Sequence, residues 1–523
     1  VARECGRLKQ ADGTQVCESD YTRDGISLTQ PMTEQEFHTY WNGKGWRKRG
    51  GKSGLRNAHI KAMKIAAPGV YDIIRRLCNL FFSHDVVFKA WKLRVLCPIP
   101  KVKGVKDMDK LRPLMFIEVL CKCVSGVMRN RHEKGIVAMN LLSSMQWAYQ
   151  RGKGTEAPLL IMNMAAEWAV RHRQELWDIG FDISKCFDSY EKEMREVSLR
   201  RTGVGERFIN RKQALEEGSE MVVLTKWGYS RSRGVSERGI PQGGEDSPLD
   251  FMCMNDVHLC VLVKLWRGGF VMMAGGRKVK VPGAAYGDDL RCLGVNEAEA
   301  QSCVNISARV FYFFGLTASP TKMWVRRLLF DEEGYLVEEY EGAGVSYPDL
   351  ELGTEVQLVI GNGEQWCKYL GERGNLMGDA TTECRRIQAE GRRTARLVGR
   401  ANLGGEGKVN IIDTVWGAKA MYALKHMVPS VQEMDGADKT VRAVCKTAMG
   451  MAVTTSSDLV EGDEGRNMGG RVSFTSKLMV EKMVVLARAL TEEQGNLLQD
   501  ATLVWVNRIQ ESTGQREGVL EGE

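Results

Sequence analysis

The chain has 523 residues, of which 43% are hydrophobic and 27% charged, and its formal net charge is +7. This composition is typical of folded globular proteins, and the length allows roughly three domains or subdomains. No apolar stretch approaches the roughly 18 residues of a membrane-spanning helix, so no membrane partner is expected. Fourteen cysteines without a CxxC pair, and only seven histidines, exclude a zinc finger or disulfide framework and predict a reducing compartment.

Residues 1–57 are predicted to form a polar N-terminal extension. Within it, Thr33 and Glu36 have capping-box spacing ahead of three aromatic residues, which predicts a short helix. The stretch "WNGKGWRKRGGKSG" follows as a basic loop. It is similar to a phosphate-binding loop, but Gly45 lies one residue too far ahead of "GKS" and no strand precedes it. We therefore expect a solvated basic loop or a nucleic-acid contact.

Further along the chain, hydrophobic periodicity alternates between helical and strand patterns. It predicts a helix at 71–82, a half-buried strand at 91–101 that ends at its prolines, another strand at 176–184, and a hairpin at 270–281. After about residue 372 the strand signals give way to helices. The expected buried face of the first helix is Ile73, Leu77, Leu80 and Phe81.

Three carboxylates stand out against these apolar patterns. Asp182 lies on the predicted strand at 176–184, on the same face as Asp178 and opposite the apolar residues, and Asp288 and Asp289 lie at the expected tip of a hairpin formed by "AAYGDDLRCLG". A polar turn explains the pair of aspartates in the simplest way, because Gly and Asp are favoured there. However, three neighbouring carboxylates raise one another's pKa unless a cation lies among them. Two Mg²⁺ ions about 3.5 to 4 Å apart need such an oxygen cage.

Three segments in order resemble the reverse transcriptases, and most closely the polymerase domain of non-LTR (LINE-type) retrotransposons. They are "FDISKCFDSY", "GIPQGGEDSP" and "AYGDD". The resemblance implies metal ligation and catalysis by Asp182, Asp288 and Asp289, with two Mg²⁺, or Mn²⁺ in their place. It also implies that Gln242 and Gly243 line the nucleotide pocket. Phe187 would be the bulky residue that excludes a ribose 2′-hydroxyl, although a core aromatic is the alternative.

The resemblance extends to both sides of these motifs. It implies that Lys101 and Arg112 lie near the triphosphate, with a structural arginine as the alternative for Arg112. Lys322, in "FGLTASPTK", would act near the departing pyrophosphate, with an exposed helix lysine as the alternative. The segment "CKYLG" would be a primer grip of Tyr369, Leu370 and Gly371.

A basic helix is expected within "CRRIQAEGRRTARLVGR". Four of its arginines fall near one helical face, which is either a solvated face or a contact for nucleic-acid phosphates. They are Arg385, Arg392, Arg396 and Arg400.

The resemblance implies an α+β, right-hand polymerase fold with fingers, an antiparallel palm sheet and a helical thumb. The expected boundaries are an extension at 1–57, fingers at 58–170, a palm at 171–371 with a fingers insertion near 200–240, and a thumb with the C-terminal region at 372–523.

The implied function is RNA-directed DNA polymerisation by two-metal nucleotidyl transfer, in retrotransposition by target-primed reverse transcription. RNA template, DNA or RNA primer and dNTPs are the expected partners. The alternatives are a viral-type RNA-dependent RNA polymerase, to which Gly287, Asp188 and Asn255 point, and an inactive retroelement-derived RNA-binding module. Because the chain begins at Val1 without a signal core, we expect a fragment of a longer reading frame. No endonuclease motif is recognised in the sequence, so endonuclease activity is expected from a missing part of the reading frame or from another protein. The expected location is intracellular, as a ribonucleoprotein in the nucleus and cytoplasm.

Overall fold

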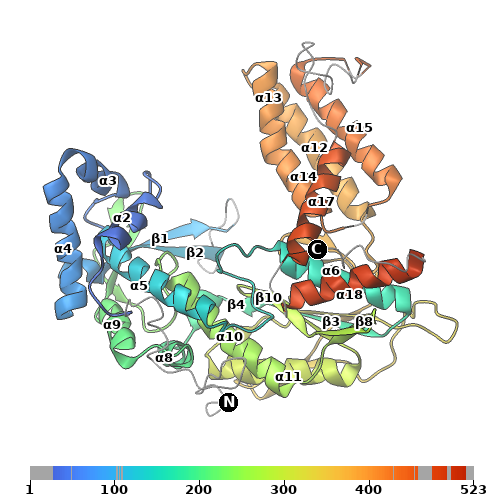
Figure 1. Cartoon of the computed structure of the whole chain (residues 1–523), viewed down its shortest axis with the longest axis horizontal. Helices are drawn as coiled ribbons and strands as arrows, with labels where there is room; N and C mark the ends of the chain where they lie inside the picture. The colour runs from blue at the N-terminus through green and yellow to red at the C-terminus, as the bar shows by residue number, and fades with distance from the viewer. Residues whose placement is uncertain are drawn as a thin grey trace.

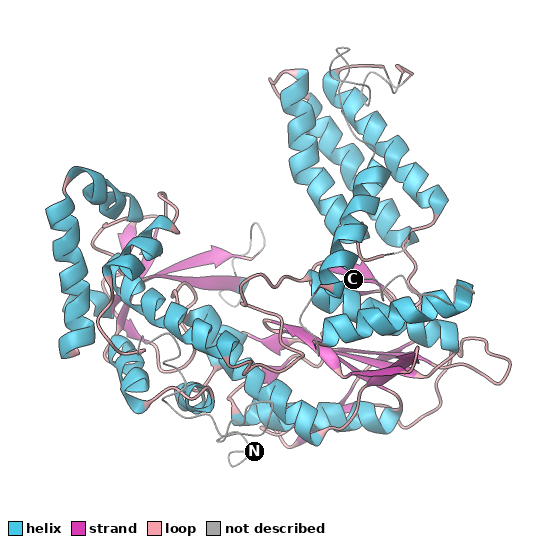
Figure 2. Cartoon of the chain, viewed as in Figure 1, coloured by secondary structure: helices cyan, strands magenta, loops and turns pink. Residues whose placement is uncertain are grey.

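The computed structural model of the chain describes residues 28–48, 50–101, 104, 107, 110–427, 429–452, 454–456, 474–491 and 496–513. Helices and strands are mixed in three parts (Figure 1 and Figure 2). We name the N-terminal part (residues 28–142 and 192–235), the central part (143–191, 236–374 and 497–513) and the helical column (381–490). Residues 1–27 of the expected extension lie outside the described residues.

The N-terminal part packs helices around one sheet. Its helices are α2 Glu34–Asn42, α3 Asn57–Ala66, α4 Pro68–His84, the short η2 Lys89–Lys92, α5 Val119–Ala138, α8 Lys192–Arg201 and α9 Glu206–Glu216. Its strands are β1 Leu93–Pro100, β2 Leu111–Phe116, β5 Glu220–Thr225, β6 Gly228–Tyr229 and β7 Gly234–Val235. The sheet order is β2-β1-β5-β6, with β7 also paired to β5, and the β1–β5 pair is parallel. Residues 192–235 therefore join this part although they lie far along the chain.

The central part contains the longest-range strand pairing. Its helices are α6 Glu156–His172, α7 Cys186–Ser189, α10 Ser247–Leu265 and α11 Glu297–Phe313. Its strands are β3 Leu176–Phe181, β4 Ile183–Ser184, β8 Phe270–Ala274, β9 Arg277–Val281, β10 Gly283–Tyr286, β11 Asp289–Gly294, β12 Thr317–Ala318, β13 Trp324–Leu328, β14 Ser346–Asp349, β15 Thr354–Gln357, β16 Ile360–Gly361, β17 Cys367–Tyr369 and β18 Glu372–Gly374. The main sheet has the order β10-β11-β3-β13-β16 and is antiparallel except for its last pair.

The helical column rises beside the central part in Figure 1. It consists of α12 Thr381–Gly399, α13 Gly405–Ile411, the π-helical turn η4 Ile412–Gly417, α14 Ala418–Leu424, α15 Val431–Met449 and α17 Phe474–Leu490. The next helix, α18 Leu497–Thr513, returns to lie beside α6, and Ala501 and Val504 share a core with Leu159 and Phe270. In the part of the chain that the structure describes, no helix combines the length and apolar character needed to cross a bilayer.

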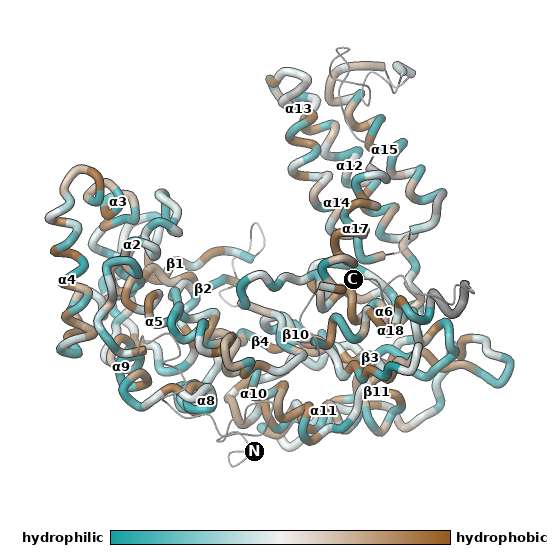
Figure 3. Tube along the Cα trace, in the orientation of Figure 1, coloured by the Kyte–Doolittle hydropathy of each residue, from teal (hydrophilic) through white to brown (hydrophobic). Residues whose placement is uncertain are grey.

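α10 connects the cores of the N-terminal and central parts. Phe251 and Met254 pack into the core around β3 and β11, whereas Leu249 and Met252 pack into the core around α4 and α5. This helix is buried along most of its length, and hydrophobic residues predominate along its trace in Figure 3. A helix that is buried on most of its faces is expected where two cores meet.

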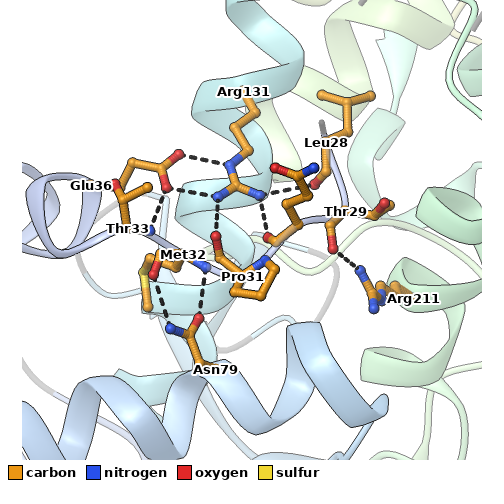
Figure 4. Close-up of polar contacts among 10 residues, drawn as sticks. Leu28, Thr29, Pro31, Met32, Thr33, Glu36, Asn79, Arg131 and Arg211 are labelled. Carbon is orange, nitrogen blue, oxygen red and sulfur yellow. Dashed lines mark hydrogen bonds and ion pairs between the residues drawn. The ribbon is translucent and has the colours of Figure 1, made fainter. Parts of the chain in front are cut away.

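Arg131 of α5 ties the start of the described chain to the N-terminal part. Its guanidinium donates to both carboxylate oxygens of Glu36 at 2.7 Å, and to the carbonyl oxygens of Leu28, Gln30 and Pro31 at 3.3, 2.7 and 3.2 Å (Figure 4). Glu36 also accepts from the backbone of Thr33, which confirms the predicted capping box. A planar guanidinium fits such a cluster of acceptors better than any other side chain.

Two details of the predicted elements are wrong. The helix is present as α4, but Ile73 and Leu77 are 55% and 37% exposed, and its buried face consists of Tyr71, Ile74, Cys78, Phe81 and Phe82. Tyr71 packs against Phe37 of α2, and this tertiary contact determines which face of α4 is buried. The strand β1 also continues through Pro98. There it pairs only with β2, because its pairing with β5 ends at Leu96, so the missing N–H is tolerated.

Candidate active site

The aspartates of "YGDD" lie where β10 turns into β11. The two strands are antiparallel with Tyr286 opposite Asp289, which confirms the predicted hairpin. Gly287 has a φ of 68°, in the left-handed region that glycine adopts without a steric cost. Gly287 and Asp288 therefore form the turn, and Asp289 begins the second strand.

Asp182 is brought to this hairpin by strand pairing. β3 is antiparallel to β11, and the pair nearest the hairpin joins Phe181 to Leu290. Asp182 follows Phe181 and Asp289 precedes Leu290, so the two aspartates extend from the same end of the pair. The backbone N–H of Ser319 donates to the carbonyl oxygen of Asp182 at 2.8 Å, which fixes the residue beyond the end of β3.

The register of these strands is braced by a buried charge cluster. Arg291 of β11 donates to Asp178 of β3 at 2.8 Å, and Arg326 of β13 donates to the other carboxylate oxygen at 2.6 Å. Burial disfavours the charged carboxylate, but the two guanidinium groups outweigh it and hold the pKa of Asp178 below its ordinary value. The sequence predicted a polar face of β3, yet every residue of this strand is buried.

The three carboxylates create an excess of negative charge. The pKa of Asp289 is raised to about 6, first by burial and then by the charges of Asp288 and Asp182. Such repulsion is relieved by a divalent cation, and carboxylate oxygens are the donors that Mg²⁺ and Mn²⁺ prefer. The residues therefore fit a divalent ion in charge and donor type. Among the described residues, however, no three acidic, histidine or cysteine side chains are grouped tightly enough to hold an ion by themselves.

A cavity of about 920 Å³ lies beside the aspartates. Several residues that the sequence assigned to metal, nucleotide or pyrophosphate line it together: Lys101, Arg112, Asp182, Phe187, Gln242, Asp288 and Lys322. Lys322 Nζ lies 3.4 Å from Asp182 Oδ1, but both side chains are well exposed, so the pair adds little stability. The backbone of Gly243 lies so close to Met115 that a Cβ would approach its carbonyl oxygen to 2.4 Å.

Phe187 forms part of the wall of this cavity. Its ring stacks on Phe251 of α10, with ring centroids 4.3 Å apart and an interplanar angle of 9°. The side chain is half-buried, so it is held by the core and still lines the cavity. Phe187 is thus a core aromatic and a cavity residue at once.

The predicted primer-grip residues lie outside the cavity lining. Tyr369 ends β17, and Leu370 and Gly371 form the turn to β18 with φ values of 50° and 91°. The Tyr369 hydroxyl donates to the carbonyl oxygen of Ala284 in β10 at 2.9 Å. The turn is therefore fixed directly to the hairpin of Asp288.

The four arginines of the basic stripe lie apart from the cavity in the helical column: Arg385, Arg392 and Arg396 are on α12 and Arg400 directly follows it, and all four are exposed. Arg392 and Arg396 line a groove of about 380 Å³ together with Lys439 of α15. The structure thus places the predicted basic stripe on one helix, where a second helix adds to its charge.

Three residues without an assigned catalytic role also surround the site. Tyr149 lines the cavity with a φ of 58°, and burial followed by the nearby charge of Asp288 raises its pKa to about 12. Asp188 lines the cavity, and Asn255 donates to the Gly287 carbonyl oxygen. The glycine-rich "YQRGKG" is a local pattern that contains Tyr149, whereas the contact of Asn255 spans 32 positions and has no local signature.

Residues 99–372 match the model of the family described as reverse transcriptase (RNA-dependent DNA polymerase). This match covers just over half of the chain and includes Asp182, Asp288 and Asp289. The chain therefore belongs to the reverse transcriptase family and is an RNA-directed DNA polymerase with a polymerase-type fold. Enzymes of this class act with divalent metal ions on a nucleic-acid template and primer and use dNTPs.

Part of the chain is similar to a curated protein of a retrotransposable element. The chain is 26% identical over 189 residues to the Retrovirus-related Pol polyprotein from type-2 retrotransposable element R2DM of Drosophila melanogaster. The aligned segment is 35% of this chain and 17% of that polyprotein. The predicted resemblance to non-LTR retrotransposon reverse transcriptases is confirmed, and the RNA polymerase and inactive-module alternatives are not favoured.

Proposed function

We propose that the chain extends the 3′-hydroxyl of a DNA or RNA primer along an RNA template with dNTPs, by two-metal nucleotidyl transfer. One observation carries this proposal: Asp182 and Asp288 line a single cavity with Lys101, Arg112 and Lys322. A cavity lined by both carboxylates and cations matches the needs of a metal-bound triphosphate. Nucleotidyl transfer relies on positioning and charge neutralisation, and so requires no histidine or nucleophilic side chain.

In this proposal, Asp182, Asp288 and Asp289 hold two Mg²⁺ ions, with Mn²⁺ as a substitute. When bound, the ions lower the pKa of the primer hydroxyl and neutralise charge on the triphosphate. Arg112 and Lys101 bind phosphate oxygens, and Lys322 supplies a positive charge near the departing pyrophosphate. Tyr369, Leu370 and Gly371 position the primer end, because their turn is joined to the catalytic hairpin.

The three parts of the molecule correspond, in our proposal, to a right hand. The N-terminal part forms the fingers, including the insertion near 200–240, the central part forms the palm, and the helical column forms the thumb. We place α6 with the palm and not with the fingers, because Leu159 and Ile161 share a core with Leu176 of β3 and Phe270 of β8. Arg385, Arg392, Arg396 and Arg400 would then contact the phosphates of the template–primer duplex from the thumb.

Retrotransposition by target-primed reverse transcription is the biological process that we propose. Its support is the relationship to the R2DM polyprotein, of which this chain matches a small part. An endonuclease would have to come from another part of the reading frame or from another protein. For location, we propose that the chain is present in the nucleus and the cytoplasm as part of a ribonucleoprotein.

Primer extension by the purified chain tests the proposed function. An RNA template with an annealed DNA primer is supplied with dNTPs or with rNTPs, in Mg²⁺ or in Mn²⁺. Extension with dNTPs supports the proposal, extension with rNTPs alone supports an RNA polymerase, and no product in either metal supports an inactive module. Asp182→Asn and Asp288→Asn should each abolish extension without unfolding the chain, and retained activity in both would contradict the metal-ligand assignment.

A further inference from the structure

Asp188 is a charged residue of the cavity wall that the proposed chemistry does not use. It lies on α7 beside Phe187, and its carboxylate accepts hydrogen bonds from Gln242 Nε2 at 3.0 Å (Oδ1) and 3.1 Å (Oδ2). Both side chains are half-buried and both line the cavity. A hydrogen bond to an ionised acceptor is stronger than one between neutral groups, so the carboxylate restrains the glutamine side chain.

The backbone of Gln242 is fixed independently of this pair. Its carbonyl oxygen accepts from the backbone N–H of Met115 in β2 at 2.7 Å, and the following Gly243 has a φ of 122° that permits close contact with the same strand. With the backbone held in this way, the side-chain torsions are the remaining freedom of Gln242. Asp188 is the residue that restricts them.

The chain is also built to bring these two residues together. Ile240 N–H donates to the Phe187 carbonyl oxygen at 2.7 Å, and Gly239 N–H donates to the Tyr190 carbonyl oxygen at 2.8 Å. A Cβ on Gly239, which has a φ of 82°, would lie 2.7 Å from the carbonyl oxygen of Asp188. Only glycine allows the two backbones to approach so closely without displacement.

The chemistry of the pair fixes the orientation of the amide. A carboxylate only accepts hydrogen bonds, so it selects the amide nitrogen of Gln242 and turns the amide oxygen away. Within the described residues, this Oε1 atom has no hydrogen-bond partner. It is therefore available to accept a hydrogen bond from a molecule bound in the cavity.

We propose that Asp188 is a positioning residue for nucleotide binding: it holds the Gln242 amide in one orientation, so that the amide oxygen faces the incoming dNTP. The inference rests on the proposed function. Asp188 acts through Gln242 and need not touch the nucleotide. Removing its charge leaves the amide free to invert, although the shape of the site is unchanged.

Asp188→Asn is the first variant, because it is isosteric and removes only the charge. In single-nucleotide incorporation by the full chain, we expect the KM for dNTP to rise roughly tenfold while kcat changes much less, because the three metal-ligand carboxylates are untouched. Glu193→Gln makes the same chemical change at an exposed residue of α8 and should leave both constants unchanged. An unchanged KM in Asp188→Asn would overturn the inference.

A double-mutant cycle tests whether Asp188 acts through Gln242. Gln242→Ala should raise the KM, and Asp188→Asn in the Gln242→Ala background should add nothing further. Additive effects would show that Asp188 acts on something else. Melting temperatures of all variants identify any loss of fold, and Asp188→Ala replaces Asp188→Asn in the cycle if the latter is unfolded.

Protection by dNTP against thermal unfolding reports nucleotide binding without extension. The wild-type chain should be protected at lower dNTP concentrations than Asp188→Asn. If the chain does not extend a primer but the wild type is still protected at lower dNTP concentrations, the proposed function is contradicted and the inference is supported. Equal or absent protection in the two proteins would contradict the inference.

Discussion

The side-chain amide of Asn255 donates a hydrogen bond from Nδ2 to the carbonyl oxygen of Gly287 at 2.9 Å. Asn255 is buried within α10, and Gly287 is the glycine of the turn that precedes Asp288. A helix shared by two cores is therefore bonded directly to the hairpin that carries Asp288 and Asp289. This contact accounts for the burial of Asn255 within α10, because buried polar groups are almost always paired.

Asn255→Ala should impair catalysis by loosening this turn. The Gly287 carbonyl oxygen would lose its donor, which costs roughly 1–3 kcal/mol for a buried acceptor. We expect kcat for primer extension to fall roughly tenfold, since small displacements of catalytic groups have effects of this size or larger. Steady-state kinetics alongside template–primer binding would separate this loss from a loss of substrate affinity.

The matched control for this substitution is Asn210→Ala, which removes an exposed amide from α9. This variant should keep wild-type kinetics. If Asn255→Ala is as active as the control, the turn does not depend on the amide, and the positioning role is wrong.

Arg131 should be the main stabilising contact of the segment that precedes α2. Its side chain is buried and joins Glu36 to three backbone carbonyl groups, so Arg131→Met leaves a carboxylate and several acceptors without their donor. Removing one partner of a buried ion pair costs about 3–5 kcal/mol. We expect a marked fall in the denaturant midpoint of the N-terminal part, measured by chemical unfolding.

Arg129 provides the comparison, because it lies on the same helix and pairs with Glu133 one turn away. Pairs of this kind contribute about 0.3–0.5 kcal/mol, so Arg129→Met should change the midpoint only slightly. Equal destabilisation by the two variants would mean that charge on α5, and not the Arg131 network, determines stability.

Local patterns in the sequence predicted much of the site. The hairpin at "YGDD" follows from a glycine and two aspartates between short apolar runs, and the strand before Asp182 follows from alternation. These elements need only neighbouring residues to be recognised. The buried face of α4 could not be predicted in the same way, because Phe37 of α2 decides whether Ile73 or Ile74 is covered.

Contacts between distant residues set the remaining features. The alternation places Asp178 on a polar face of its strand, but Arg291 and Arg326, more than a hundred positions away, neutralise it inside the sheet. Asp188 and Gln242 are 54 positions apart and meet only because of a close backbone approach at Gly239. Periodicity and motif spacing carry no information on such pairs, so the residues that position the catalytic groups emerge only from the folded chain.

Two buried histidines should make the fold sensitive to acid. Burial lowers the pKa of His132 and of His258 from 6.5 to about 3, and each ring donates to or accepts from a hydroxyl, of Thr202 and Ser307 respectively. Below pH 6.5 the unfolded chain takes up protons that the folded chain does not, so stability is lost as the pH falls from there toward 3. Each histidine should cost about 2 kcal/mol between about pH 7.5 and about pH 5.

Unfolding midpoints measured across this pH range test the assignment. His258→Gln keeps a polar group near Ser307. Whatever this substitution does to stability at neutral pH, it should reduce the pH dependence of the unfolding midpoint by the contribution of one proton. His84→Gln, at an exposed position at the end of α4, should leave the dependence as it is in the wild type. An identical acid slope in His258→Gln and the wild type would refute a neutral, buried His258.

Phe187 should determine which sugar the cavity accepts. Its ring is held against Phe251 at 4.3 Å and forms part of the cavity wall, so it cannot move aside easily for an additional hydroxyl group. Phe187→Ala should raise the ratio of kcat/KM for rNTPs to that for dNTPs by roughly tenfold or more, because a steric barrier is removed and no new contact is needed. Competition between the two nucleotides on one RNA template measures this ratio directly. Phe313→Ala, at an exposed aromatic residue of α11, is the control and should not change it. If the ratio in Phe187→Ala stays at the wild-type value, Phe187 is only a core residue, and another part of the cavity selects the sugar.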